Sequence, residues 1–230
     1  MREVARRITK RSSLVAGIVQ NVNPDPGNVI LGPEWATLRA PATMIERIGP
    51  YKLQTSPGAF LQANLWTARR IYEAATEWAD PDPSDHVLDL FCGVGPQTFH
   101  LAARARLAIG IEEVPAAVAD ARSNARRNGI HNARFEAGLA EEVVARVGAR
   151  LGSVGVVALN PPRKGARRDV LEAIARLLPR RIVYVSCNPA TLARDLRLLQ
   201  GLGYPARRVR PFDMLPQTEH VEVLALAERG

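Results

Sequence analysis

From residue 62 onward, short apolar runs alternate with amphipathic stretches along this chain of 230 residues. Between 62 and 79 the apolar positions recur every three to four residues, which predicts a helix with one buried face. Strand-length apolar runs then alternate with segments of helical period. We expect strands at 86–91, 107–111, 133–136, 154–160, 181–187, 207–213 and 220–226. We expect the intervening helices at 97–104, 115–128, 140–147, 170–178 and 190–200.

This alternation predicts an α/β domain in which helices cover both faces of a mostly parallel, seven-stranded sheet. Residues 1–58 follow a different pattern, with short β-like runs at 14–19, 28–31 and 37–40 among Pro and Gly turns. They are too few for a complete domain. We therefore expect a partial, β-rich lobe over 1–58 and the α/β domain over 59–230.

The overall composition is that of a globular protein, with 47% hydrophobic and 23% charged residues. No apolar run approaches the ~20 residues that a membrane-spanning helix needs. The basic N-terminus is not followed by the apolar core of a signal peptide. We expect a cytoplasmic, monomeric protein that does not bind membranes.

The charge balance is basic, with 31 Lys and Arg residues against 23 Asp and Glu residues. All of the basic residues except Lys10, Lys52 and Lys164 are arginines. Arginine suits phosphate groups and stacks on bases, so the excess indicates a nucleic-acid partner. An arginine-biased composition explains the excess equally well.

The sequence has two cysteines, Cys92 and Cys187, and four scattered histidines. A single disulfide is not expected in a cytosolic chain. The cysteines and histidines do not show the spacing of metal ligands, so we expect no metal site.

A glycine-rich turn, Asp-Leu-Phe-Cys-Gly-Val-Gly at 89–95, follows the strand expected at 86–91. Glycines such as Gly93 let a backbone turn sharply and approach a ligand closely. Glu112 ends the next strand, where a carboxylate can accept both hydroxyls of a ribose. These features predict a nucleoside cofactor, and Cys92 is expected to be a small packed residue.

A second motif, Asn-Pro-Pro-Arg-Lys-Gly at 160–165, stands at the end of the strand 154–160. Methyltransferases that act on exocyclic amines carry an aromatic residue at the fourth position of a similar motif. Here that residue is Arg163, which suits a carbonyl or a phosphate instead.

The third feature is a thiol, Cys187, at the exit of the strand 181–187, together with the acidic segment 211–222. Uracil C5 is a poor nucleophile, but addition of a thiolate at C6 turns the ring into an enolate that accepts a methyl group at C5. A base must then remove the C5 proton so that the cysteine can leave. Taken alone, Cys187 is either a core residue or a nucleophile.

Five segments in this order resemble the RNA uracil-C5 methyltransferase family. They are Phe-Leu-Gln-Ala-Asn at 60–64, the motifs at 89–95 and 160–165, Ser-Cys-Asn-Pro at 186–189, and Phe-Asp-Met-Leu-Pro-Gln-Thr-Glu-His-Val-Glu at 212–222. The resemblance implies a class I, Rossmann-like fold and S-adenosylmethionine (SAM) as cofactor. The spellings of three motifs lean toward the branch that methylates a uridine in 23S rRNA.

The resemblance also implies roles for individual residues. Cys187 matches the nucleophile and Glu222, rather than Glu219, matches the base, while Arg163 belongs to the uracil site and Phe60 packs near the base. The residues that the resemblance and the glycine turn assign to SAM are Gln62, Phe91, Gly93, Glu112 and Asn160.

The N-terminal part departs from that branch, whose members carry a four-cysteine iron–sulfur cluster and a longer β lobe. The chain resembles their catalytic domain with the tail of that lobe. Two alternatives stay open: a catalytically silent protein that binds RNA or SAM, and an RNA cytosine-C5 methyltransferase. The latter group uses a second cysteine beside the proline motif, where this chain has Asn160.

Overall fold

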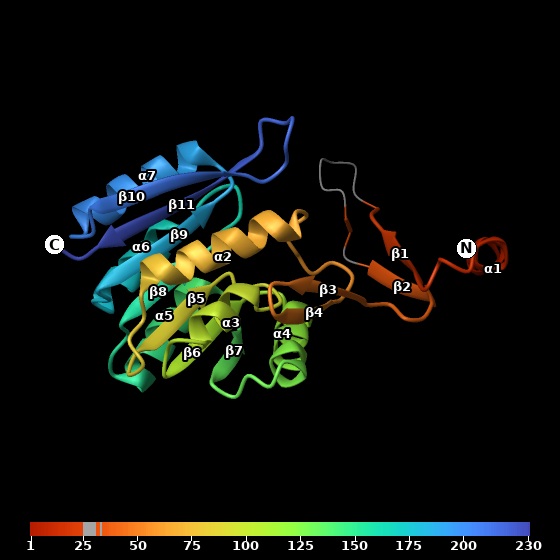
Figure 1. Ribbon diagram of the computed structural model, residues 1–230, viewed down its shortest axis with the longest axis horizontal. Coiled ribbons are helices and arrows are strands. Elements are labelled where there is room, and N and C mark those ends of the chain that lie inside the picture. The colour runs from red at the N-terminus through yellow and green to blue at the C-terminus, as the bar shows by residue number, and fades with distance from the viewer. Residues whose placement is uncertain (25–30, 33) are drawn as a thin grey trace.

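A seven-stranded sheet forms the centre of the computed structural model, which describes residues 1–24, 31–32 and 34–230 (Figure 1). The strand order is β10-β11-β9-β8-β5-β6-β7, and only β11 runs against the other six. The strands are β5 His86–Leu90, β6 Leu107–Glu112, β7 Ala133–Ala137, β8 Val156–Leu159, β9 Arg181–Ser186, β10 Ala206–Asp213 and β11 Val221–Glu228.

Helices cover both faces of this sheet, because its central strands are apolar on both sides; every residue of β8 is buried. The core on one face contains residues of α2, α3 and α4, and the core on the other contains residues of α5, α6 and α7. The helices are α2 Leu65–Ala79, α3 Pro96–Ala102, α4 Pro115–Arg127, α5 Ala140–Leu151, α6 Arg168–Arg176 and α7 Pro189–Gly201. The expected sheet and helices are thus confirmed, with ends that shift by a few residues.

The order of the strands places a crevice at the carboxyl ends of β5 and β8. After β5 the chain continues to β6 and β7 on one side, and it later forms β8 and β9 on the other. Connections that leave in opposite directions open a gap above the sheet, which is where doubly wound folds bind their ligands. The motifs at 89–95 and 160–165 both begin at this edge.

The N-terminal part contains more regular structure than the sequence predicted. A helix, α1 Arg2–Arg11, precedes two antiparallel hairpins, β1 Ile18–Val22 with β2 Glu34–Arg39 and β3 Met44–Ile48 with β4 Tyr51–Thr55. The predictions at 14–19 and 37–40 overlap β1 and β2, whereas α1, β3 and β4 were missed. Residues 28–30 of the run expected at 28–31 lie outside the described residues.

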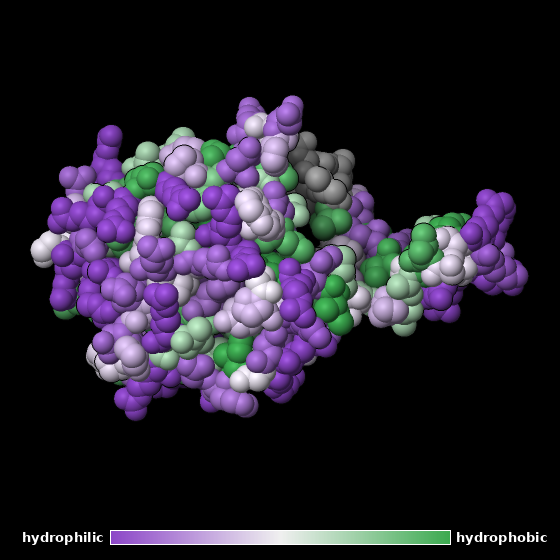
Figure 2. All heavy atoms as spheres, in the orientation of Figure 1, coloured by the Kyte–Doolittle hydropathy of each residue, from purple (hydrophilic) through white to green (hydrophobic). Residues whose placement is uncertain are grey.

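The two hairpins differ in where they lie. Figure 1 shows α1, β1 and β2 projecting from the body that the seven-stranded sheet and its helices form, with β3 and β4 against α4. Figure 2 shows hydrophobic side chains on the surface of the projecting arm, where Val4 and Ile8 are exposed. In contrast, Ile48 and Leu53 of the second hairpin are fully buried in the core beneath α2.

Three polar side chains, two of α4 and one of its C-terminal cap residue, hold the free edge of β4. Asn124 Oδ1 accepts from the Gln54 N–H at 2.7 Å, and its Nδ2 donates to the Gln54 carbonyl at 2.9 Å. Asn128 makes the same pair of bonds with Lys52, and Asp120 accepts from the Ser56 N–H at 2.6 Å. The spacings match, since four helical residues rise about 6 Å and two strand residues about 6.6 Å.

Among the described residues, the structure has no helix that is both long enough and apolar enough to cross a membrane.

Candidate active site

A cavity opens at the carboxyl ends of β5 and β8 and gathers four of the five side chains or turns predicted to contact SAM. These are Gln62, Phe91, Gly93 and Asn160. The cavity is also lined by Phe60, Leu61, Tyr72, Asp89, Cys92, Val94, Pro96 and Gln97. The segment just before α2, the glycine turn and the proline motif therefore meet at one place, although up to 100 positions separate them in the sequence (60 to 160).

The glycine turn is shaped by three residues in the left-handed region, Phe91 (φ 61°), Gly93 (φ 53°) and Gly95 (φ 95°). A Cβ at Gly95 would lie 2.9 Å from the Phe99 ring and 3.1 Å from the Phe135 ring, so only glycine is accommodated there. Phe91 adopts this conformation with a side chain, which is a strained backbone of the kind found at ligand sites.

Glu112, the fifth predicted SAM contact, ties the glycine turn to the neighbouring strand. Its two carboxylate oxygens accept from the Gly93 N–H and the Val114 N–H, each at 3.0 Å. Each oxygen has a further lone pair, so the half-buried carboxylate can still accept hydroxyl donors. The position at the end of β6 is the one that the sequence predicted.

Two buried polar residues of the cavity, Asp89 and Gln97, were not predicted from the sequence; they are 1% and 3% exposed. Burial raises the pKa of Asp89 to about 7, although the hydrogen bond that it accepts from Thr98 Oγ1 opposes the shift. Asp89 Oδ1 and both polar atoms of the Gln97 amide find no partner within the described protein. Such groups are costly unless a ligand or water satisfies them, so this part of the cavity suits a polar cofactor.

The sequence offered a signal for Asp89 only, because this residue stands inside the glycine-turn motif. Gln97 is recognised from the structure, as a polar residue of the short helix α3, whose every position is buried.

Cys187 lies between the end of β9 and the first turn of α7. The next residue, Asn188, caps α7 by accepting from the Ala190 N–H at 3.0 Å, and Pro189 occupies the first turn. The thiol is half-buried and free. Burial and then the negative charge of Glu222 raise its pKa, while the positive charge of Arg163 lowers it.

Glu222 lies on β11 and is 6% exposed. Burial raises its pKa to about 7, against a hydrogen bond from Gln62 and the charge of Arg163. Its Oε2 atom has no partner within the described protein. Glu219, the other acidic residue of this motif, is exposed in the loop before β11, so the two carboxylates occupy different environments.

Two side chains at the start of α7 hold the backbone of Arg163. Its carbonyl accepts from Asn188 Nδ2 at 3.3 Å and from Thr191 Oγ1 at 3.2 Å. Its guanidinium is exposed and lies 3.0 Å from Nδ1 of His220. The strand exit that carries Cys187 therefore also fixes the loop that carries Arg163.

Two predicted residues differ in exposure. Phe60 is 68% exposed at the rim of the cavity, where a ring can face an incoming base. Cys92 is 6% exposed in the core below the turn, in agreement with its prediction as a small packed residue.

A buried polar network supports the proline motif from below. Asp195 Oδ2 accepts from the Tyr184 hydroxyl at 2.6 Å and from the Ala166 N–H at 2.9 Å. The Ala166 N–H also points at the Tyr184 oxygen, at 3.0 Å. This network anchors the loop three residues beyond Arg163.

We expect Tyr184→Phe to lower both the free energy of unfolding, by about 1 kcal/mol, and the rate of any reaction that needs Arg163, because the loop loses a buried anchor. Tyr204→Phe is the matched control, since the buried Tyr204 hydroxyl donates to the Pro179 carbonyl before β9 and makes no bond to the loop of Arg163. Urea unfolding and a methylation assay measure the two effects. Equal losses of activity in both variants would contradict a specific role for Tyr184.

Comparison with known proteins identifies the family. Residues 45–229 match the family model described as tRNA (Uracil-5-)-methyltransferase. The chain belongs to this family. It is 47% identical, over 97% of its length, to an uncharacterized RNA methyltransferase of Geobacter sulfurreducens, and 41% identical over 96% to one of Oceanobacillus iheyensis. It covers 45% and 48% of those proteins, so it spans about half the length of the relatives it matches.

Solved structures agree with the family. The tRNA (uracil-54, C5)-methyltransferase of Pyrococcus abyssi, in complex with S-adenosyl-L-homocysteine, is 29% identical with a TM-score of 0.73. The match covers 92% of this chain and 50% of that one. Pyrococcus abyssi Trm5b, 18% identical with a TM-score of 0.67 over 99% of this chain and 68% of that one, shares the fold. The predicted RNA uracil-C5 methyltransferase family and class I fold are confirmed.

Proposed function

We propose that this protein transfers a methyl group from SAM to C5 of a uracil in RNA. One observation carries the proposal: the antiparallel register of β9 and β11 pairs Ser186 with Val223, so the thiol of Cys187 and the buried carboxylate of Glu222 stand at the next pair of positions. The charge of Glu222 accordingly raises the pKa of Cys187. The positive charge of Arg163 lowers the pKa of both groups. Gln62 hydrogen-bonds to Glu222 and also lines the cavity. A thiol, a carboxylate and a cation in one place are what methylation at C5 requires.

The cavity suits SAM, and the residues that would hold it are Gln62, the turn at Phe91 and Gly93, Glu112 and Asn160. When bound, SAM supplies the methyl group. Asp89 and Gln97 offer further polar atoms that the described protein leaves unpaired.

The residues of the chain divide the chemistry between them. The thiolate of Cys187 forms a bond to C6 of the uracil, and the electron pair of the C5–C6 double bond moves into an enolate. Arg163 faces the developing charge on the carbonyl oxygen. After C5 has gained the methyl group, Glu222 accepts the C5 proton. The electron pair then reforms the double bond and expels the Cys187 thiolate.

We propose 23S rRNA as the substrate, because the spellings of the motifs at 89–95, 160–165 and 212–222 lean toward the branch that methylates it. Transfer RNA is a second candidate, since the related Pyrococcus abyssi enzyme acts on uracil 54 of tRNA. Incubation of the protein and tritiated SAM with unmodified rRNA and tRNA transcripts separates the two. Label in neither RNA would contradict the proposed function.

Cytosine methylation is the less favoured reaction, because the position beside the prolines is occupied by Asn160 and not by a cysteine. A cytosine-only product in a digest of the labelled RNA would reverse this order. We further propose that the protein acts as a cytoplasmic monomer.

Glu112→Ala should weaken the binding of S-adenosylhomocysteine by about 2 kcal/mol, because the cofactor loses a charged acceptor and the glycine turn loses its anchor at Gly93. Glu113→Ala removes an exposed neighbouring carboxylate and is the matched control. Calorimetric titration measures both affinities. Unchanged binding in a folded Glu112→Ala protein would rule out this cofactor contact.

A further inference from the structure

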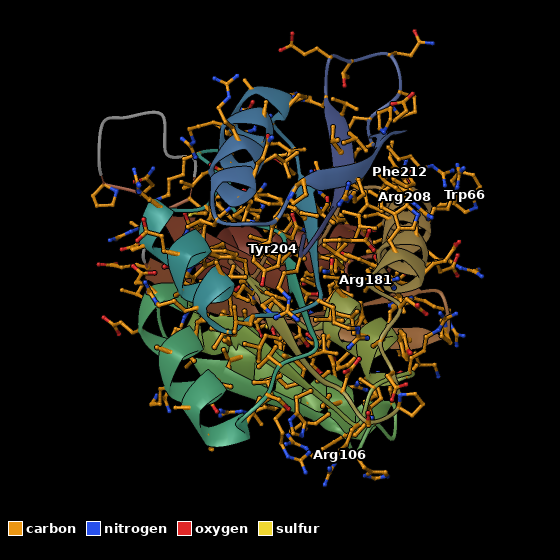
Figure 3. All side chains as sticks on the ribbon, turned by 90° about the vertical axis from the view of Figure 1, so that its left-hand side faces the viewer. Trp66, Arg106, Arg181, Tyr204, Arg208 and Phe212 are labelled. Atoms are coloured by element: carbon orange, nitrogen blue, oxygen red, sulfur yellow. The ribbon has the colours of Figure 1, made fainter. Side chains whose placement is uncertain are left out.

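A groove beside the candidate active site runs between α2 and the edge strand β10. Its lining includes Asn64, Trp66 and Arg70 from the helix side and Arg210, Phe212 and Asp213 from the strand. Figure 3 shows the labelled Trp66, Arg208 and Phe212 gathered on this side of the molecule. The site described above uses none of these residues.

Arginine and aromatic side chains are paired along this groove. The Arg70 guanidinium lies over the Trp66 ring, 4.8 Å from its centre, and Arg210 lies over Phe212 at 4.9 Å. Farther along, the Arg208 guanidinium lies 5.9 Å from the centre of the Trp78 ring. From Trp66 to Trp78 the helix advances about 18 Å, so the three pairs form a track of about that length along α2 and β10.

The track starts at the active site. Phe212 is the direct cross-strand partner of Glu222, so their side chains leave the same face of the sheet. On the helix side, Asn64 donates to the Met214 carbonyl at 3.1 Å and stands two positions after Gln62. Trp66 follows Gln62 by four residues, and so it lies within about 14 Å of it.

The charge of the track is available for a ligand. Arg70, Arg208 and Arg210 take no part in the ion pairs found within the described chain. The neighbouring Glu73 already pairs with Arg69 at 2.7 Å. Two further carboxylates, Glu77 and Asp213, are exposed nearby and limit the net charge without pairing these arginines.

Trp66 is 67% exposed, which is unusual for a large aromatic side chain with no packing role. Aromatic rings beside arginines are the means by which proteins hold single-stranded nucleic acid, with bases stacked on the rings and phosphates on the guanidinium groups. A protein partner would need a wider apolar patch than this narrow track provides.

We propose that the track of Trp66, Arg70, Arg208 and Arg210 binds the single-stranded RNA next to the target uridine. The base nearest the target stacks on Trp66, and the backbone continues along Arg210 and Arg208 toward Trp78. This inference rests on the proposed function, because it assumes that RNA enters the site at Cys187 and Glu222. It assigns part of RNA binding to the catalytic domain itself.

The test compares two RNA lengths. One probe is a fluorescent single-stranded RNA of about 12 nucleotides with one central uridine, and the other is its central trinucleotide. Trp66→Ala should weaken binding of both RNAs about tenfold, because the base nearest the target is part of the trinucleotide. Arg208→Ala and Arg210→Ala should leave binding of the trinucleotide unaffected, because the RNA backbone reaches these arginines only beyond it. Arg208→Ala and Arg210→Ala should each lower the slope of log affinity against log salt by about 1.

Arg106→Ala is the matched control, since Arg106 is an exposed arginine at the far end of the molecule from Trp66 (Figure 3). Thermal unfolding verifies that each variant is folded, and the two arginine variants test the track independently of Trp66. If Trp66→Ala, Arg208→Ala and Arg210→Ala bind the longer RNA as Arg106→Ala does, or if the parent binds neither RNA, the track is refuted.

A separate measurement of tritium transfer distinguishes the two proposals. A parent protein that binds the longer RNA through Trp66 but never methylates RNA refutes the proposed function and supports the track. A parent that methylates RNA, with variants that bind as the parent does, refutes the track alone.

Discussion

Glu222→Gln is expected to accumulate a covalent complex of protein and RNA that survives a denaturing gel and carries the methyl group of SAM. Without the carboxylate, Cys187 can still add to C6 and C5 can still be methylated, but the C5 proton stays. Elimination then stalls with the thioether bond intact. The parent protein should show little of this complex, because elimination empties that state.

Two further variants serve as controls for this result. Cys187→Ala should give neither complex nor product, since the ring is never activated. Glu219→Gln should behave as the parent does, because Glu219 is exposed outside the buried pair. Each variant is incubated with RNA and methyl-labelled SAM and then denatured. A labelled complex in Cys187→Ala, or in Glu219→Gln and not in Glu222→Gln, would show that the roles are wrongly assigned.

The second large effect is on stability. Burial raises the pKa of Glu222 from 4.5 to about 7, so the folded state holds an extra proton between these values. Stability therefore falls as the pH rises through this window and stays lowered above pH 7. Glu222→Gln removes this loss. The free energy of unfolding of this variant should be close to that of the parent near pH 4.5 and exceed it by roughly 3 kcal/mol at pH 8.

Urea unfolding at the two pH values measures this difference. The exposed Glu219→Gln variant should follow the parent at both pH values. Asp89, whose pKa is also raised to about 7, titrates in the parent and in both variants, so its contribution cancels. If the parent and Glu222→Gln lose stability in parallel, Glu222 is not the group whose burial opposes folding.

The seven-stranded sheet and its helices could be predicted because most of their signals are local. The strands β5, β6, β8, β9 and β11 are short, mainly apolar runs, and each helix shows its own period, so no distant residue was needed to find them. The second hairpin was missed for the opposite reason. Its strand β4 alternates exposed or half-exposed residues such as Lys52 and Gln54 with buried ones, and the partners that fix it stand on α4, 70 or more positions later.

Some residues of the candidate site could be predicted from the sequence, and others could not. Motif resemblance indicated Cys187, Glu222 and Arg163, and the structure brings these three together. Asp89 and Gln97 were missed as cavity residues, because a buried polar side chain is recognised only when the atoms around it are known. Helix α1 was also missed, since its ten residues include four arginines and only one buried residue, Ala5, so they carry a weak apolar signal.

Asn124 of α4 and Asn128 at its C-terminal cap bond to β4 as a neighbouring strand would. Because these two amides take up the N–H groups of Gln54 and Lys52, and the Asp120 carboxylate takes up that of Ser56, another chain cannot extend that edge of the hairpin. The hairpin also cannot reach its final position until α4 has formed, and the two should therefore open and close as one cooperative unit. A truncation that kept the sheet but cut at residue 58 would remove the partner of α4 and leave Asn124, which is fully buried, facing solvent with its hydrogen bonds to Gln54 lost.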